Sequence, residues 1–453
     1  MSIERETICA LATPVGTAAI ALLRVSGGDC GRLVREIFAE GPRPRVARYR
    51  DYHDRDGRLL DDVVFIFFEG PRSYSGEDSL EISCHGNPFI AQKILGDLCA
   101  RGCRMAEPGE FTQRAFLSGR MDLTQAEAVM DLIYARSERA LTAANGLLRG
   151  ALGRRVTRLA DGLLDAVARI EAYIDFPEED LPAEDRSAIA AQLQSILSDA
   201  ETLLATNTYG ELLREGIKTV ILGAPNAGKS SLLNRMVGRE RALVSPEPGT
   251  TRDFIEERIM IGPHGLRLID TAGLNDSPAP LEGLGIEKTL ECANAADIFL
   301  WVVDSTLPVP ILPIELQALL KSKPTVLVLN KSDLVRDQRI PSNSVGHGFP
   351  SVEFSALTGE GLENLRENLA RLADSLQQDL GDDAVAINVR HAEALRRMLS
   401  ALVEASSKLQ KGISAELLAS DLRAALDALG EIGGKIDHEQ VLDRLFATFC
   451  IGK

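Results

Sequence analysis

The order of hydrophobic and polar positions divides the chain into four zones, and the first zone mixes strands with helices. Apolar residues form short runs at 17–27 (TAAIALLRVSG) and 61–70 (DDVVFIFFEG), which predicts two strands. The stretch 87–102 has apolar residues at helical spacing behind a capping asparagine and before a glycine, so it predicts a helix. Residues 1–118 therefore read as an N-terminal α+β domain.

The second and fourth zones repeat apolar residues at helical spacing. In the second zone, 119–215, this spacing runs through 123–148, stops at the two prolines of IDFPEEDLP, and resumes at 188–205. In the fourth zone, 376–453, it returns after an acidic linker. We predict that the two zones form the two parts of one helical domain.

The third zone, 216–375, alternates apolar strands with helical patterns. Its apolar runs are IKTVILG, LRLIDTAG, DIFLWVVD, TVLVLNKSD and SVEFSAL. This alternation is the pattern of a doubly wound sheet. Because helical zones lie on both sides of it in the sequence, the simplest architecture is an α/β domain inserted into the helical domain. The predicted fold class is therefore multidomain, α/β and α+β.

Composition narrows the class of protein. The formal net charge is −16, whereas a simple nucleic-acid binder is normally basic. Seven cysteines, odd in number and dispersed, argue against a disulfide framework. No apolar run is long enough to cross a bilayer, and the N-terminus lacks the basic start and long apolar stretch of a secretion signal. These features predict a cytoplasmic protein with no membrane partner.

A glycine-rich loop follows the first strand of the third zone. Residues 223–230 read GAPNAGKS, which matches G-x-x-x-x-G-K-[ST] between an apolar strand and a helix. Gly223 and Gly228 allow the backbone to turn its N–H groups onto phosphate oxygens. Lys229 would reach the β- and γ-phosphates, and Ser230 would offer its hydroxyl to Mg²⁺. We therefore predict a nucleoside triphosphate site.

Three further motifs indicate that the nucleotide is GTP. Asp270 of DTAG would act through a water on Mg²⁺, and the Gly273 N–H would meet the γ-phosphate. Asp333 of NKSD can accept from N1–H and the exocyclic amine of guanine, a pattern that adenine cannot satisfy. Ser355 of SAL would close over the base. Four motifs in this order predict a guanine-nucleotide site.

Two groups are needed for hydrolysis beyond those that hold the nucleotide. In GTTRD, Thr250 or Thr251 would bind Mg²⁺ in the GTP state, and we choose Thr251 because it lies nearer the next strand. Many GTPases place a water-orienting glutamine after the DTAG glycine, but Leu274 stands there and cannot orient water. Glu282 in the following loop is a candidate acting through water; the alternative is a solvated loop charge.

A cation must also stabilise the transition state. The amide oxygen of Asn226 could hold a monovalent ion, with carbonyl groups of the 245–250 loop adding oxygens of the kind that K⁺ prefers. The alternative is that Asn226 is a turn-forming asparagine. Lys229 and Glu282 are the predicted catalytic residues for GTP hydrolysis. The predicted GTP-binding residues are Gly223, Asn226, Ala227, Gly228, Lys229, Ser230, Ser231, Ser245, Thr250, Thr251, Asp270, Thr271, Ala272, Gly273, Asn330, Lys331, Asp333, Ser355 and Ala356.

With these motifs placed, the chain resembles one family nearly from end to end, the MnmE (TrmE) tRNA-modification GTPases. The resemblance is carried by ATPVG, LLRVSG, SYSGEDSLEISCHG, EPGEFTQRAFLSGRMDLTQAEAVMDLI, EAYIDFPEED, LLREGIKTVILGAPNAGKSSLLN, GTTRD, DTAGL and the terminal FCIGK. PGEFTQRAFL and FCIGK are the most specific of these segments.

The resemblance implies cofactors and partners that composition did not show. The N-terminal domain would bind a tetrahydrofolate as one-carbon source, 5,10-methylenetetrahydrofolate or a related form with the 5-formyl form as bound analogue, and would form a constitutive homodimer. Two GTPase domains would meet across the dimer when K⁺ and GTP are bound, so that K⁺ replaces an arginine finger. With the flavoprotein MnmG (GidA), the complex would add an aminomethyl or carboxymethylaminomethyl group to carbon five of the wobble uridine of certain tRNAs.

The resemblance also implies residue roles. Glu282 falls on the family's water-orienting glutamate. Arg120 stands where related sequences carry lysine, which keeps the charge but changes the geometry. The implied ligands are Ser230 and Thr251 for Mg²⁺, Asn226, Ser245, Glu247 and Thr250 for K⁺, and Arg24, Glu81, Arg120 and Lys453 for the folate.

Two features outside these motifs each keep two interpretations. His85 could transfer a proton near the folate, or it could be a structural histidine in a turn. The basic run Arg149, Arg154, Arg155 and Arg158 could contact tRNA phosphates, or it could be a solvated helix face.

Two other functions compete with tRNA modification. A ribosome-assembly switch predicts an appended RNA-binding module such as a KH domain, whereas after residue 375 the pattern shows only helix and the FCIGK tail. A lipid-anchored signalling GTPase predicts a tail ending in Ser, Met, Gln, Ala, Leu or Phe, whereas Lys453 is last. Cys450 is then either a reactive thiol that takes part in modification or a packing residue.

Overall fold

The computed structural model divides the chain into two compact units. One comprises Met1–Met130, Leu147–Ser198 and Glu393–Lys453, and the other Asp131–Gly146 and Asp199–Ala392. The structure describes residues 6–175, 183–238, 255–270, 282–310, 312–335, 348–376, 385–434, 445–447, 449, 450 and 452, with the backbone alone for 183–185, 255 and 282–288. Because one compact unit can hold more than one domain, the predicted boundaries at 119, 216 and 376 stay predictions.

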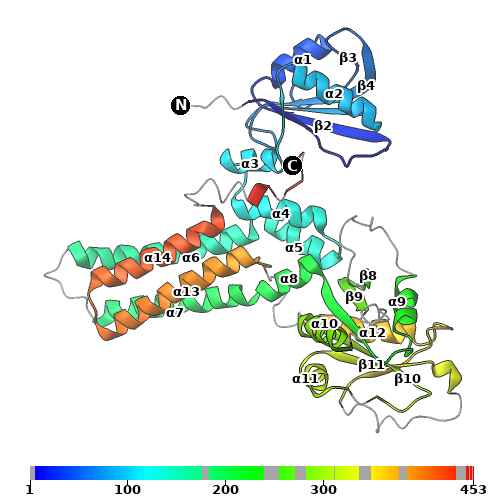
Figure 1. The fold of residues 1–453 in the computed structure, drawn as a ribbon. Helices are drawn as coiled ribbons and strands as arrows, with labels where there is room; N and C mark the ends of the chain where they lie inside the picture. The colour runs from blue at the N-terminus through cyan, green and yellow to red at the C-terminus, as the bar shows by residue number, and fades with distance from the viewer. Residues whose placement is uncertain are drawn as a thin grey trace. The chain divides into compact units, whose positions relative to one another are not determined.

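The first unit begins with a six-stranded sheet in the order β3-β4-β5-β2-β1-β6. Its strands pair antiparallel except β1 and β6, which are parallel. Three helices accompany the sheet (Figure 1). The bounds are β1 Ile8–Leu11, β2 Ile20–Ser26, α1 Cys30–Phe38, β3 Arg48–His53, β4 Leu59–Phe68, β5 Ser79–His85, α2 Pro88–Ala100, β6 Arg104–Met105 and α3 Glu110–Leu117.

The predicted elements of this domain are confirmed. Strand β2 lies within the predicted run 17–27, and β4 overlaps the predicted run 61–70. Helix α2 falls inside 87–102. Helix α2 begins there because the Asn87 side chain accepts a hydrogen bond from the Phe89 N–H and proline occupies the first turn. Side chains from the sheet, α1 and α2 form one buried apolar core.

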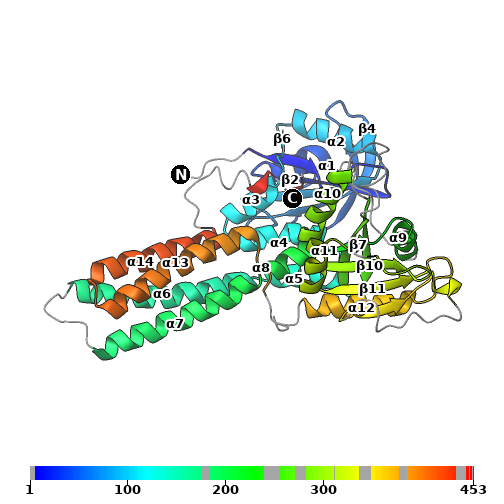
Figure 2. The ribbon, with the colours of Figure 1, turned by 60° about the horizontal axis from the view of Figure 1, so that its bottom comes forward.

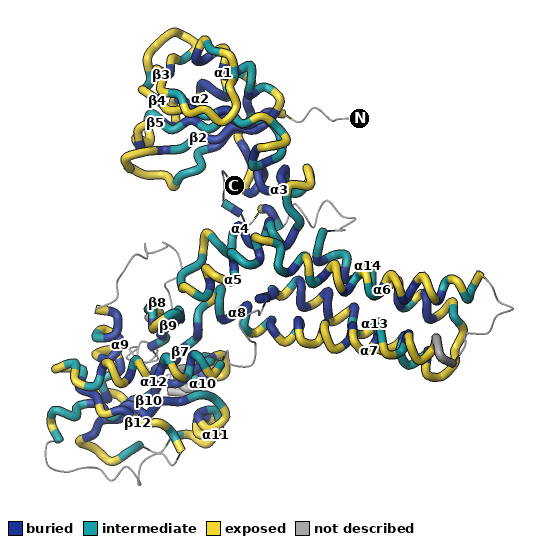
Figure 3. Tube along the Cα trace, turned by 180° about the vertical axis from the view of Figure 1, so that it is seen from behind, coloured by how far each residue is buried: buried dark blue, intermediate teal, exposed yellow. Residues whose placement is uncertain are grey.

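Four long helices form a bundle, α6 and α14 whole and most of α7 and α13 within the first unit (Figures 1 and 2). Figure 3 shows buried and exposed positions alternating along them, as expected for amphipathic helices. Between helices, Lys408 of α13 pairs with Asp421 of α14 at 2.6 Å, and Gln192 of α7 donates to the Gly162 carbonyl of α6 at 2.8 Å. The bounds are α6 Ala151–Asp175, α7 Ala183–Ala205, α13 Val389–Lys411 and α14 Ala415–Gly433.

The apolar repeat over 123–148 is two helices rather than one. Helix α4 spans Leu123–Tyr134 and α5 spans Glu138–Leu148. The hydroxyl of Ser137 accepts a hydrogen bond from the Ala140 N–H at 3.1 Å and thereby caps α5. Apolar spacing alone did not reveal this break, because the periodicity continues on both sides of it.

The second unit contains another six-stranded sheet, in the order β12-β11-β10-β7-β9-β8. All neighbours pair parallel except the edge strand β8, which is antiparallel to β9. Helices α8, α9, α10, α11 and α12 connect or flank these strands. The bounds are α8 Asn207–Glu215, β7 Ile217–Leu222, α9 Lys229–Val237, β8 Ile255–Ile261, β9 His264–Asp270, α10 Glu282–Ala295, β10 Ile298–Asp304, α11 Ile314–Ser322, β11 Thr325–Asn330, β12 Ser351–Glu353 and α12 Leu362–Ser375.

This sheet is the predicted doubly wound α/β domain, and the predicted fold class is confirmed. Every residue of the central strand β10 is buried, because helices cover both faces of a parallel sheet (Figure 3). Strand β9, next to the edge, alternates buried and half-buried positions. Among the residues that the structure describes, no helix has the length and apolarity needed to span a membrane.

Candidate functional site

The glycine-rich loop joins β7 to α9 and takes a shape that only small residues allow at two positions. Gly223 and Gly228 have φ angles of +157° and +94°. A Cβ on Gly223 would lie 2.3 Å from the Val302 carbonyl oxygen, and a Cβ on Gly228 would lie 2.1 Å from the Asn330 amide nitrogen. Asn226 has a φ of +63°, a conformation that asparagine tolerates better than most residues. The loop thus turns as a phosphate cradle requires.

The side chain of Lys229 contacts the backbone of this loop. Its side chain is buried, and its ammonium donates to the carbonyls of Gly223 at 2.9 Å and Ala224 at 3.0 Å. Burial lowers the pKa of Lys229, while nearby Asp270 acts to raise it. The two carbonyls hold the ammonium against the backbone of the glycine-rich loop.

Ser230 and Asp270 meet beside the lysine. The Ser230 hydroxyl donates to the Asp270 carboxylate at 2.7 Å, and Asp270 is fully buried at the end of β9. Parallel β7 and β9 pair so that Ile221 lies opposite Asp270, which brings the carboxylate to the glycine-rich loop. The sequence placed these two residues in separate motifs, and the sheet brings them into contact.

The predicted base-binding residues gather at the ends of β11 and β12. Asn330 is buried; its amide donates to the Ala227 carbonyl at 2.8 Å, and its side-chain oxygen accepts from the Ala356 N–H at 3.1 Å. The Ser355 hydroxyl donates to Asp333 at 2.6 Å. Asn330 therefore braces the glycine-rich loop against the SAL loop, while Ser355 orients the carboxylate expected to receive guanine.

Lys331 forms a further contact at this end of the sheet. Its φ is +64°, and its ammonium pairs with Asp304 at 2.6 Å. Burial acts to raise the pKa of Asp304, but hydrogen bonds from Lys331 and Thr306 outweigh it and lower the pKa. Asp304 was not among the predicted site residues. Asp304 ends the apolar run DIFLWVVD, and that position at a strand end could have indicated it as a site residue.

The other predicted residues of the nucleotide site differ in exposure, and some lie outside the described part of the chain. Ala227 of the loop is buried, whereas Asn226 of the loop and Ser231 in α9 are exposed. The backbone of Glu282 begins α10, but its side chain is outside the described part of the chain. Also outside it are Ser245, Glu247, Thr250, Thr251, Thr271, Ala272, Gly273, Leu274 and Lys453.

A second cluster lies in the first unit, around Arg24. Arg24 on β2 pairs with Glu81 on β5 at 2.8 Å, and donates to the Gly452 carbonyl at 3.2 Å. The guanidinium carbon lies 5.1 Å from the ring centre of Tyr74 and 5.9 Å from that of Phe111. The cluster therefore combines a cation, a carboxylate and two aromatic faces. Tyr74 and Phe111 were missed as site residues, although both stand inside motifs that carried the family resemblance.

The C-terminal tail reaches this cluster through packed aromatic residues. Phe446 and Phe449 are buried, with ring centres 5.1 Å apart. The Gly109 N–H donates to the Cys450 carbonyl at 3.3 Å, and a Cβ on Gly452 would lie 2.7 Å from the Leu11 carbonyl oxygen. The tail thus packs closely against the N-terminal domain. Cys450 is half-buried, and its chemistry stays a prediction.

Arg120 is exposed beside the 73–77 turn, where a Cβ on Gly76 would lie 3.0 Å from its side chain. His85 ends β5 rather than lying in a turn, and its Nδ1 lies 2.8 Å from Asp61, which raises the pKa of His85. Of the basic run at the start of α6, Arg149, Arg154 and Arg158 are exposed.

Comparison with known proteins identifies the family. A model of the MnmE helical domain matches residues 123–450, and a model described as the GTP-binding protein TrmE N-terminus matches residues 7–120. The chain is 59% identical to the tRNA modification GTPase MnmE of Opitutus terrae, over 99% of each chain. It is 43% identical to that of Akkermansia muciniphila over the whole of both chains, and 40% identical to that of Natranaerobius thermophilus over 99% of each. The chain therefore belongs to the MnmE family of tRNA modification GTPases, enzymes that hydrolyse GTP.

Proposed function

We propose that this protein hydrolyses GTP in a K⁺-dependent way and, with the flavoprotein MnmG (GidA), uses that cycle to modify carbon five of the wobble uridine of certain tRNAs with an aminomethyl or carboxymethylaminomethyl group. The observation that carries the GTPase half is the convergence of Lys229, Ser230 and Asp270 at the glycine-rich loop. Family membership supports the modification half.

In the proposed hydrolysis, residues of this chain bind and orient the nucleotide. Loop N–H groups and Lys229 hold the β- and γ-phosphates, so that charge developing in the transition state meets fixed dipoles and a cation. Asp333 accepts from guanine, and Ser355 keeps that carboxylate in place. Glu282 orients the attacking water, replacing the glutamine that Leu274 excludes.

The residues present fit Mg²⁺. The Ser230 hydroxyl and the Asp270 carboxylate supply oxygens, the donors that Mg²⁺ prefers, and they already lie 2.7 Å apart. Ser230 and Thr251 would hold the ion directly, and Asp270 through a water. When bound, the ion neutralises charge on the phosphate oxygens.

Potassium is proposed to act beside Asn226, which is exposed and has a φ of +63°. Ser245, Glu247 and Thr250 are the other proposed ligands. We expect GTP turnover at least about tenfold faster in KCl than in NaCl of equal ionic strength, because the cation supplies transition-state stabilisation worth about 1.4 kcal/mol or more. Steady-state phosphate release in the two salts measures this. Equal turnover would remove the cation role of Asn226.

The Arg24 cluster fits a folate. The Arg24 guanidinium can pair with the acidic tail of a folate, and the Glu81 carboxylate can accept hydrogen bonds from the N–H groups of its ring. We propose 5,10-methylenetetrahydrofolate or a related form as the ligand, with Arg24, Glu81, Arg120 and Lys453 in contact with it. When bound, it would supply the one-carbon unit.

Replacing Arg24 tests this site. We expect Arg24→Gln to raise the dissociation constant of 5-formyltetrahydrofolate about tenfold or more, because a charge-assisted hydrogen bond contributes about 1.5–3 kcal/mol. Isothermal titration calorimetry on the full chain measures it. Arg32→Gln, which removes an arginine from partly exposed ion pairs on α1, should leave the constant unchanged. Equal affinities in the two variants would contradict the assignment.

The modification itself is tested on tRNA. In a strain lacking this protein, we expect wobble uridines of its substrate tRNAs to lose the carbon-five group, and nucleoside analysis by mass spectrometry would show this. Reintroducing the chain should restore the group, whereas a Lys229→Met variant should not. Unchanged nucleosides would favour the alternative of a ribosome-assembly switch. We propose in addition that the protein forms a homodimer, that its GTPase domains pair across the dimer, and that it is cytoplasmic.

A further inference from the structure

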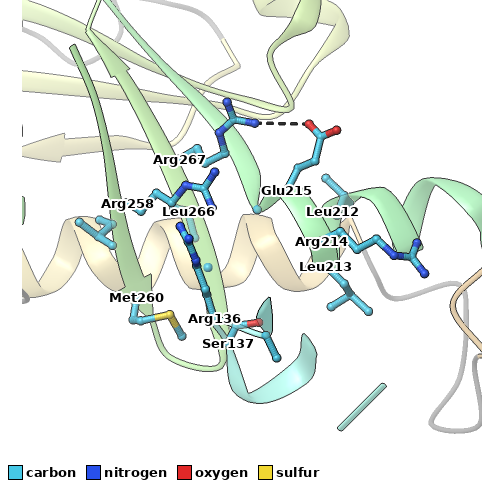
Figure 4. Close-up of a pocket in the computed structure, with 14 residues that line it drawn as sticks. Arg136, Ser137, Leu212, Leu213, Arg214, Glu215, Arg258, Met260, Leu266 and Arg267 are labelled. Carbon is cyan, nitrogen blue, oxygen red and sulfur yellow. Dashed lines mark hydrogen bonds and ion pairs between the residues drawn. The ribbon is translucent and has the colours of Figure 1, made fainter. Parts of the chain in front are cut away.

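A cavity of about 320 Å³ lies at the amino end of β7, in the second unit (Figure 4). Three segments line it: 135–137 between α4 and α5, 212–216 at the end of α8, and part of the β8–β9 hairpin. The glycine-rich loop begins at the other end of β7. Six strand residues lie between, about 20 Å at the usual rise. The cavity is therefore separate from the proposed GTP site.

The charged residues that line the cavity are mainly arginines. Arg136, Arg214, Arg258 and Arg267 line it, against a single carboxylate, Glu215. This concentration of arginine stands in a chain whose net charge is −16. In Figure 4 the side chains of Arg136, Arg258 and Arg267 gather at the β8–β9 hairpin. The site favours an anion, since guanidinium groups bind carboxylate, phosphate and sulfonate oxygens with paired hydrogen bonds.

All four arginines have partners, and Arg258 meets Glu256 only at 3.6 Å. Arg214 is held by both oxygens of Asp131, at 2.8 and 2.9 Å, and its guanidinium points away from the other arginines in Figure 4. Arg267 is held by Glu256 at 2.8 Å but meets Glu215 only at 3.3 Å. The Glu215 side chain is 52% exposed. Exposed pairs of this kind are weak, so an incoming anion can replace Glu215 on Arg267.

The rest of the lining is apolar. Half-buried Leu213 and Met260 supply apolar surface that a ligand can reach, while Leu212, Ile259 and Leu266 are buried core residues behind the lining. A purely inorganic anion would leave this surface uncovered. The volume is that of a small organic molecule. We propose that the cavity binds a small organic anion, an apolar ring or chain that carries one phosphate, sulfonate or carboxylate group.

Gly265 offers a way to fill the cavity without straining the backbone. It lies on β9 opposite Met260, and its φ is not positive. A Cβ there would meet only the Ser137 Cβ, at 3.7 Å, an ordinary contact. Because Ser137 lines the cavity from the facing segment, a Gly265→Phe ring would enter the space between them.

The test uses a matched pair of fluorescent probes on the full chain, with GDP at saturation so that the nucleotide site is filled. The probes are 1-anilinonaphthalene-8-sulfonate and N-phenyl-1-naphthylamine, which share a ring system but differ in the sulfonate. We expect one saturable site for the sulfonate. Arg136→Gln/Arg258→Gln should raise its dissociation constant about tenfold or more and that of the neutral probe less than twofold. Gly265→Phe should weaken both probes.

A control double variant, Arg397→Gln/Arg423→Gln, removes the same charge from exposed arginines of α13 and α14 and should leave binding unchanged. Sulfonate binding that is equal in the cavity and control variants would overturn the proposal. Loss with Gly265→Phe but not with the arginine variant would overturn its anionic part. If the arginine variant does not unfold cooperatively, hydrogen exchange on the unsubstituted protein decides. Protection by the sulfonate probe at 135–137, 212–216 and 258–267 supports the site, and protection only elsewhere refutes it.

Discussion

Lys229→Met is expected to reduce GTP hydrolysis about a hundredfold or more, the cost of removing one preorganised charge donor from a transition state. The ammonium is buried and held between two loop carbonyls, so no other described lysine of the loop can take its place. Methionine keeps most of the side-chain volume, so the fold should survive. Single-turnover hydrolysis at saturating GTP measures the chemical step.

The control for this substitution is Lys218→Met, on the neighbouring strand β7. Lys218 pairs with Glu215 at 2.8 Å near the surface, away from the glycine-rich loop. Its loss should change turnover less than twofold, since surface ion pairs contribute little. If the two variants lost activity equally, the effect would belong to the stability of the sheet and not to the phosphate site.

Asp333→Asn is expected to lower the affinity for GTP about a hundredfold. Two hydrogen bonds from guanine to a carboxylate would be lost, at about 1.5 kcal/mol each. Asparagine can still accept from the Ser355 hydroxyl, so the loop should keep its shape. The same variant should bind xanthosine triphosphate better than GTP, because xanthine presents a carbonyl where guanine has its amine, and the asparagine amide can donate to it. Competition against a fluorescent GTP analogue measures both nucleotides.

Glu353→Gln is the matched control for that exchange. Glu353 occupies an exposed position of β12, two residues before Ser355, and its neutralisation should leave both affinities unchanged. A loss of GTP binding by Asp333→Asn without any gain for xanthosine triphosphate would indicate a distorted loop and would argue against direct recognition of the base.

Much of the fold could be predicted because its patterns are local. The strands around 20–26 and 59–68, the helix after Asn87 and the alternation over 216–375 all follow from spacing that neighbouring residues impose. The break between α4 and α5 was not anticipated. Ser137 caps α5 at this break, and apolar periodicity does not register such a cap.

The candidate site could be predicted only where one short motif contains all of the residues that act together. The glycine-rich loop is such a motif, because the turn, the lysine and the serine stand within eight residues. The aromatic residues around Arg24 come from separate parts of the chain, and so does the contact from Gly452. No spacing rule links them, which is why Tyr74 and Phe111 were missed.

The sequence by itself determined the residue types and the order of the motifs: GAPNAGKS, DTAG, NKSD, SAL and a terminal FCIGK tail. Only the tertiary structure decided which of them touch. Parallel pairing of β7 and β9 carries Asp270 to Ser230, and Asn330 closes against Ala227. These contacts join residues 40 and 103 positions apart. They arise because a sheet sets distant strand ends side by side, and the linear order of residues does not specify that distance.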